Sequence, residues 1–292
     1  MALVRNAANT LRKGRIGETT YYTSKGRQIA RQSLNNSNYG ESARRSLAQQ
    51  TRRVKWANLV NFYKLCSRWM PKAFESKKPG QTDYNKFMQL NINAQRVALT
   101  RDQAINGGCV PDAFAITQGT ITPCALSSST LTSRLVVGET FNPINANTVT
   151  IGELAQALIE NNADIVAGMQ LSLVIVRSST DGAGIPRSKV EFYEAVLDPS
   201  STEVISKYFD HELERGSNNT LSCGAIVHGG NPTAFILSQQ TDTGLKVSSE
   251  TLAGTFTMAE QFSTAAVVEA AIATYGVDKE VILNPDSAEP IV

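Results

Sequence analysis

The sequence has few residues of the kinds that build metal sites and catalytic centres. Its 292 residues include only two histidines and four cysteines. The cysteines are separated by 43, 15 and 99 residues, and none of these spacings matches the close pairs of a zinc site. A Cys109–Cys124 disulfide is conceivable, but free thiols are the expectation for a chain made in a reducing cytoplasm. We expect no metal and no other cofactor.

Enzyme motifs are also missing. The chain has no glycine-rich phosphate loop, no GxGxxG, no HExxH and no GxSxG elbow. The stretch nearest to a catalytic site is YFDHELERG, with Asp210, His211, Glu212 and Glu214, and the other histidine is His228. Two neighbouring groups without an identifiable third are too few for a metal site or a triad. A non-enzymatic protein is therefore predicted, and a hydrolase using His211 stays as a minor hypothesis.

Long hydrophobic runs are absent as well. The first twenty residues, MALVRNAANTLRKGRIGETT, lack the apolar stretch of a signal peptide, and charge or glycine interrupts the later apolar stretches. We expect no secretion signal and no membrane span. A hydrophobic fraction of 41% with 18% charged residues is typical of a globular protein.

Acidic residues are scarce in the first third of the chain. Residues 1–96 hold 19 lysines and arginines against four acids, an excess of +15, whereas the remainder holds nine against 22, a balance of −13. The net charge of +2 hides this division. Two regions with different neighbours explain it better than a uniformly solvated surface does. The basic region is suited to nucleic acid or to the acidic region of a neighbouring copy.

The basic region predicts a hairpin followed by helices. Strands over 19–23 and 27–31 flank an SKG turn, and two strands bury too little apolar area to be stable alone. Residues 41–70 show a helical apolar stripe that ends at Pro71. A second helix is expected around 82–93, with Thr82 or Asp83 as its N-cap.

After Gly107 and Gly108 the composition becomes rich in strand formers, so we expect a domain boundary near residue 105. Thr150 and Glu153 have capping-box spacing and predict a helix, and a last helix is expected over 258–275. Gly244 is expected to take a positive φ in a turn. Strands are predicted over 113–117, 133–137, 169–177, 189–197, 221–228, 233–239 and 245–249.

These elements predict an α+β protein. A basic hairpin and helical arm occupies residues 1–105, and an acidic β-sandwich-like domain with two helices occupies residues 106–292.

The basic side chains of the arm are the candidate contacts to a partner. Few acids alternate with them, so pairing along the helix does not account for the run, and binding of a polyanion or an acidic protein surface is favoured over simple solvation. The predicted contact residues are Arg12, Lys13, Arg15, Lys25, Arg27, Arg31, Arg44, Arg45, Arg52, Arg53 and Lys55.

Four longer stretches resemble a known family: GRIGETTYYTSKGRQIARQS, AQQTRRVKWANLVNFYKL, FILSQQTDTGLKVSSETL and AAIATYGVDKEVILNP. They are similar to a poorly characterised structural protein family of gut Bacteroidetes and their crAss-like phages. The likeness spans most of the chain, and its motifs carry no known chemistry.

The resemblance implies a bacteriophage virion structural protein, made in the host bacterial cytoplasm and located in the virion, with no catalytic residues. A ring component of the head-to-tail connector is the leading expectation, and an auxiliary (decoration) capsid protein is the alternative. Expected partners are copies of itself in a symmetric homo-oligomer, portal, capsid or tail components, and the phosphates of DNA. A sequence-nonspecific DNA-binding accessory protein is the competing hypothesis.

Overall fold

The computed structural model describes most of the chain from residue 47 to residue 275 and parts of the N-terminal region. The described residues are 2–3, 14–16, 19–24, 27–32, 47–124, 126–129, 132–138, 141, 148–209, 213–215, 220–223, 231–242 and 244–275. They form two compact units, residues 1–50 and 51–292, and each unit is described by itself.

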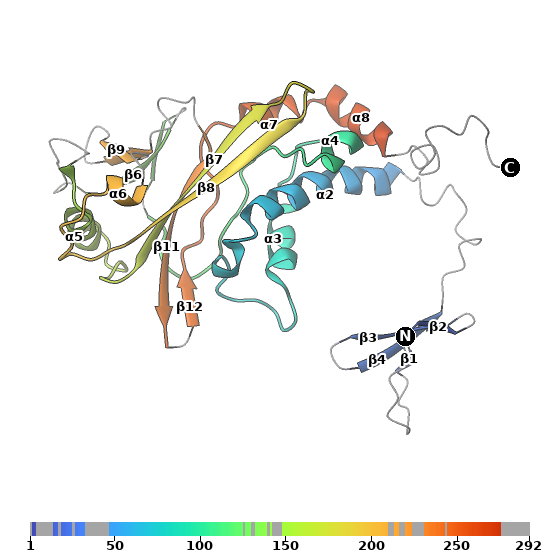
Figure 1. Ribbon diagram of the computed structural model, residues 1–292, viewed down its shortest axis with the longest axis horizontal. Coiled ribbons are helices and arrows are strands. Elements are labelled where there is room, and N and C mark those ends of the chain that lie inside the picture. Colours follow the sequence, from blue (N-terminus) through green and yellow to red (C-terminus); the bar gives the residue numbers. More distant parts are fainter. Residues whose placement is uncertain are drawn as a thin grey trace. The chain divides into compact units, whose positions relative to one another are not determined.

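The first unit contains a small antiparallel sheet (Figure 1). Its strand order is β1-β4-β3-β2, and the strands are β1 (Ala2–Leu3), β2 (Gly14–Ile16), β3 (Thr19–Ser24) and β4 (Arg27–Gln32). The predicted hairpin is confirmed, with Tyr21 paired to Ala30 across it. Among its side chains that the structure describes, only Ala30 is buried.

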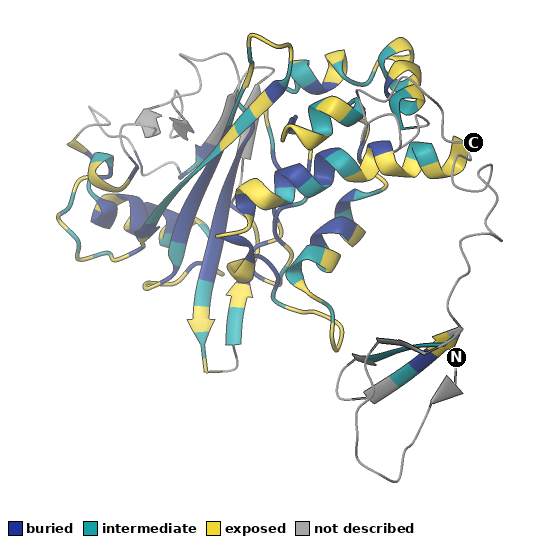
Figure 2. Ribbon diagram, turned by 45° about the vertical axis from the view of Figure 1, so that its right-hand side comes forward, coloured by how far each residue is buried: buried dark blue, intermediate teal, exposed yellow. Residues whose placement is uncertain are grey.

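A central antiparallel sheet organises the second unit. Its order is β12-β11-β7-β8. The strands are β7 (Gln170–Thr180), β8 (Pro186–Val196), β11 (Thr233–Thr241) and β12 (Gly244–Val247). Figure 2 shows β7 and β11 buried between the elements on either side. Alternate residues of a strand point to opposite faces, so both faces of these apolar strands need a cover.

Helices cover one face of this sheet. They are α2 (Leu47–Cys66) and α3 (Asp83–Asn91), with a 3-10 turn at Met70–Lys72. Phe62 of α2 and Phe87 of α3 lie in one buried cluster with Val174 of β7 and Ile236 of β11. Three shorter helices complete this side of the chain: α4 (Arg101–Ile105), α7 (Thr257–Gln261) and α8 (Ala265–Thr274).

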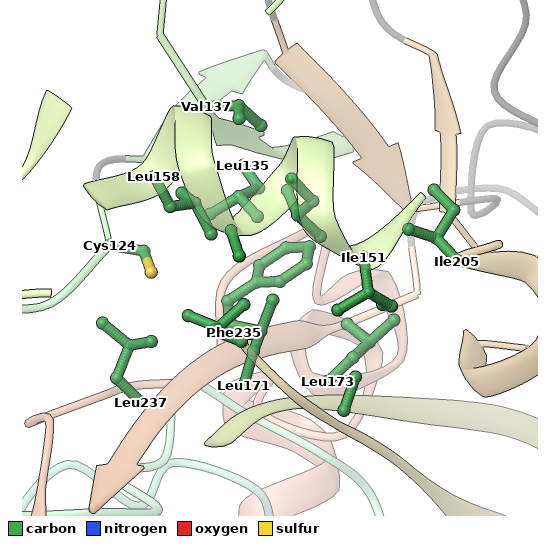
Figure 3. Close-up of a cluster of buried hydrophobic side chains, with 14 of the residues drawn as sticks. Cys124, Leu135, Val137, Ile151, Leu158, Leu171, Leu173, Ile205, Phe235 and Leu237 are labelled. Atoms are coloured by element: carbon green, nitrogen blue, oxygen red, sulfur yellow. The ribbon is translucent and has the colours of Figure 1, made fainter. Parts of the chain in front are cut away.

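The other face packs against α5 (Ile151–Asn161) and a second sheet (Figure 3). Leu158 of α5 and Leu135 of the second sheet share a buried cluster with Phe235 and Leu171. The short helix α6 (Ser206–Phe209) closes the same side through Phe209. The second sheet has the order β5-β6-β10-β9, with β5 (Leu126–Ser129), β6 (Thr132–Val136), β9 (Leu213–Arg215) and β10 (Thr220–Cys223).

The predicted α+β class is confirmed, and so are several local signals. Thr150 and Glu153 form the capping box at the start of α5, and Thr82 caps α3. Gly244 has φ of 129° at the β11–β12 turn. The last predicted helix is two helices, because Thr264 caps a new start at α8.

The predicted boundary near residue 105 is not where the structure divides the chain. The compact units separate between Gln50 and Thr51. The physical reason is the cluster around Phe62 and Phe87, which is incomplete without the face of the sheet that contains Val174. Residues 51–105 therefore belong to the same unit as the β-rich part.

The predicted strand over 113–117 is also wrong. Its centre, Ala115, makes only an isolated bridge to Thr251. The side chain of Asn91 forms hydrogen bonds with the backbone of Ala115 instead. Asn91 Nδ2 donates to Ala115 O at 2.9 Å, and Ala115 N donates to Asn91 Oδ1 at 2.8 Å. A buried side-chain amide thus replaces a neighbouring strand.

A second buried asparagine fastens α2 to the loop after α4. Asn58 Nδ2 donates to Val110 O at 2.8 Å, and Val110 N donates to Asn58 Oδ1 at 2.9 Å. Because both residues are fully buried, water cannot replace these bonds.

We expect Asn58→Ala to lower the free energy of unfolding by about 2–4 kcal/mol, because it leaves a buried N–H and a buried C=O without partners. Urea unfolding checks this. The exposed Asn93→Ala serves as the matched control, and a loss below about 0.5 kcal/mol for Asn58→Ala would contradict the role of this bridge.

Candidate partner-binding surface

The outer face of α2 presents cations and one large aromatic side chain. Arg53, Trp56, Val60 and Lys64 are spaced by three, four and four residues, which places them along one side of a helix. Val54, Asn58, Leu59 and Phe62 are on the buried side. The periodicity that packs α2 onto the sheet therefore also fixes which of its cations face solvent, and Figure 2 shows buried and exposed positions alternating along this helix.

Seven cations on α2, on α3 and on the segments that follow α2 have no carboxylate oxygen within 4.0 Å among the described residues. These cations and Trp56 form what we call the basic surface: Arg52, Arg53, Lys55, Trp56, Lys64, Arg68, Lys78 and Lys86.

Other cations of the same layer do have acidic partners. Lys72 pairs with Glu194 at 3.4 Å, Lys77 with Asp83 at 2.6 Å, and Arg96 with the buried Asp112 at 3.0 Å. The two acids of residues 51–96, Glu75 and Asp83, are too few to neutralise the layer. The uncompensated charge is held on a helix that a hydrophobic core keeps in place.

Aromatic rings connect α2 to α3 beside these cations. Trp56 is 41% exposed, and its ring centroid lies 6.5 Å from that of Tyr84. Tyr84 in turn meets Tyr63 edge to face at 5.1 Å. Burial raises the pKa of both tyrosines, with a further contribution from Asp83 for Tyr63. Both phenols stay neutral at physiological pH and do not neutralise the cations.

The structure places the predicted contact residues unevenly. Arg52, Arg53 and Lys55 are exposed on α2. Arg31 is exposed on β4, with its guanidinium carbon 5.7 Å from the centroid of the Tyr22 ring. Arg15 and Arg27 lie on described strands, but their side chains are outside the description. The other predicted contacts lie outside the described residues: Arg12, Lys13, Lys25, Arg44 and Arg45.

Sequence reasoning missed the second half of the basic surface. Lys64 was not predicted, although it lies eleven residues, or about three helical turns, after Arg53. Lys86 reaches the surface from α3, and no pattern within α2 predicts that neighbour. The spacing between Arg53 and Lys64 was the available signal.

Side chains that could hold a metal ion are not clustered in the described part of the chain. No cluster of three histidine, cysteine or acidic side chains is found there. Cys66, Cys109 and Cys124 are free and buried, and burial raises the pKa of Cys109 and Cys124 to about 12. The predicted free thiols are confirmed for these three. Asp210, His211, Glu212 and His228 lie outside the described residues.

The comparisons with family models, curated proteins and solved structures found no match. Among the helices that the structure describes, none has the length and apolarity to cross a membrane. The described residues form a cationic surface that includes an exposed aromatic side chain, which is suited to binding anionic partners.

Proposed function

We propose that this chain is a bacteriophage virion structural protein that acts by binding, as an oligomeric ring component of the head-to-tail connector. The observation that carries the proposal is the basic surface, where seven cations that have no carboxylate partner among the described residues share one layer with an exposed tryptophan. Like charges held close together repel, and an anionic partner relieves that repulsion. A partner of this kind is a neighbouring copy, another virion protein or DNA.

The N-terminal sheet supports assembly as well. Ala30 is the one buried side chain among those that the structure describes in these four short strands, and a small sheet is stable only when its apolar face is covered. We expect the sheet to be stabilised by packing against a partner, as is typical of arms that join the copies of an oligomer.

Purified virus particles provide the test. Mass spectrometry is expected to find the chain at a copy number fixed by the symmetry of a ring, and a reconstruction of the intact particle is expected to place it between head and tail. A position on the capsid surface would favour the auxiliary capsid role instead. Absence from the particles would contradict the proposal.

Trp56 favours a second candidate, a sequence-nonspecific DNA-binding accessory protein. An exposed aromatic ring beside arginines and lysines is the arrangement on which bases of single-stranded DNA stack. Full-length protein is needed for this experiment, because residues 51–105 share a core with the sheet. Affinity for DNA is expected to fall steeply with salt, and Arg53→Ala to reduce the slope of log K against log salt by about 1. Lys246→Ala, at an exposed position of β12, is the control.

A further inference from the structure

The side of the central sheet opposite the basic surface has the opposite charge. Residues 148–166 and 198–209, which form α5, α6 and their flanking segments, carry five acids and one lysine. The lysine, Lys207, is already paired with Glu203. Residues 51–96 carry ten cations and two acids on the other side. Figure 1 shows α2 and α3 on one side of the sheet and α5 and α6 on the other.

Exposed apolar side chains are also found on these acidic segments. Three of the large apolar residues that the structure describes as exposed are Val166, Val204 and Tyr208. Gly168 N donates to Leu197 O at 2.8 Å, which holds the segment after α5 against the end of β8.

Val204 forms a bridge with Thr150 at the start of α5, and α6, which carries Tyr208, contacts β8. We call the exposed apolar residues and the acids of these segments the acidic surface: Glu153, Glu160, Asp164, Val166, Asp198, Glu203, Val204 and Tyr208.

The two surfaces match each other in composition. The acidic surface has apolar side chains among carboxylates, and the basic surface has Trp56 and the half-buried Val60 among cations. An apolar centre with a charged rim is the usual anatomy of a protein interface. DNA would neutralise the basic surface but leave the exposed valines and Tyr208 in water. Contact between two copies covers both surfaces at once.

We infer that the acidic surface of one copy binds the basic surface of the next copy. This inference rests on the proposed function as an oligomeric structural protein. Because the two surfaces lie on opposite sides of one sheet, the contact is head-to-tail and each copy uses both surfaces. Repetition of such a contact closes into a ring or continues as a filament. The partner of the basic surface is therefore a second copy of this chain.

Charge reversal on the full-length chain tests the inference. The first variant is Arg53→Glu with Lys64→Glu, and the second is Glu160→Lys with Glu203→Lys; all four positions are on helices or segments with exposed side chains. Wild-type protein is expected to sediment as an oligomer at about 50 mM salt and to dissociate as rising salt screens the charges. Each variant alone is expected to shift to monomer at low salt.

An equal mixture of the two variants is expected to reassemble, because alternating copies restore opposite charge at every contact. Lys246→Glu with Glu260→Lys, a matched reversal at exposed positions outside both surfaces, is expected to leave assembly unchanged. Circular dichroism confirms that each variant is folded.

Failure of the mixture to reassemble would overturn the inference, as would assembly of either variant alone at the wild-type level. A loss of DNA binding by Arg53→Glu with Lys64→Glu, with no change in assembly, would assign the basic surface to DNA instead. A chain that is monomeric at every salt concentration but present in particles would overturn this contact and leave the virion role intact. A chain that self-assembles but is absent from particles would leave this contact intact and overturn the virion role.

Discussion

Replacing Glu250 by glutamine is expected to flatten the pH dependence of stability between about pH 4.5 and pH 8. Glu250 is buried, its Oε1 has no hydrogen-bond partner among the described residues, and burial raises its pKa from 4.5 to about 8. A hydrogen bond from Ser248 offsets part of this effect. The carboxyl is therefore protonated in the folded protein over a pH range in which it is ionised in the unfolded chain.

The sign follows from proton binding. Between about pH 4.5 and 8 the folded state holds a proton that the unfolded state has lost, so the free energy of unfolding falls as the pH rises. The slope approaches about 1.4 kcal/mol per pH unit, which amounts to a loss on the order of 5 kcal/mol across the window. Above pH 8 the loss is complete. Glutamine does not ionise, so the stability advantage of Glu250→Gln over wild type is expected to grow through this window.

Urea unfolding at intervals from pH 4 to pH 9 measures the effect as a difference between variant and wild type, in which the other titrating groups cancel. Glu260→Gln, at an exposed position of α7, is the control and is expected to leave the slope unchanged. Parallel curves for Glu250→Gln and wild type would contradict this prediction, because they would show that Glu250 does not lose a proton on unfolding in this range.

Phe62→Ala is expected to lower the free energy of unfolding by about 3–5 kcal/mol and to destabilise helices and sheet together. Phe62 is fully buried, with ring centroids 6.1 Å from Phe87 and 5.0 Å from Phe114. Removing its ring leaves a cavity between α2 and the central sheet, and the cost includes lost packing as well as lost burial.

Two probes measured together check this prediction. Far-ultraviolet circular dichroism follows the helices, and fluorescence of Trp69, whose ring stacks on Phe192 of β8, follows the contact with the sheet; Trp56→Phe removes the other tryptophan. Both transitions are expected to coincide and to move equally in Phe62→Ala. Leu65→Ala, at a position 39% exposed on the same helix, is expected to cost less than about 1 kcal/mol. Separate transitions for helices and sheet would contradict the single unit of residues 51–292.

Local signals in the sequence predicted many of the elements. The capping box of Thr150 and Glu153, the cap at Thr82 and the turn at Gly244 all involve residues within three or four positions of each other. Hydrogen bonds and backbone preferences of this range are encoded in a short stretch, and the runs of strand formers over 169–177 and 233–239, which predicted β7 and β11, are equally local. For the basic surface, the scarcity of acids in the first third of the chain identified Arg52, Arg53 and Lys55.

The sequence by itself determined the α+β class, the basic and acidic division of the chain and the start of α5. Only the tertiary structure decided that α2 belongs with the sheet, since Asn58 meets a backbone partner 52 residues away. It likewise decided that Ala115 pairs with a side chain, that Glu250 is buried, and that the two charged surfaces lie on opposite sides of one sheet. Contacts between distant residues depend on how whole faces pack, and no short stretch of sequence encodes that packing.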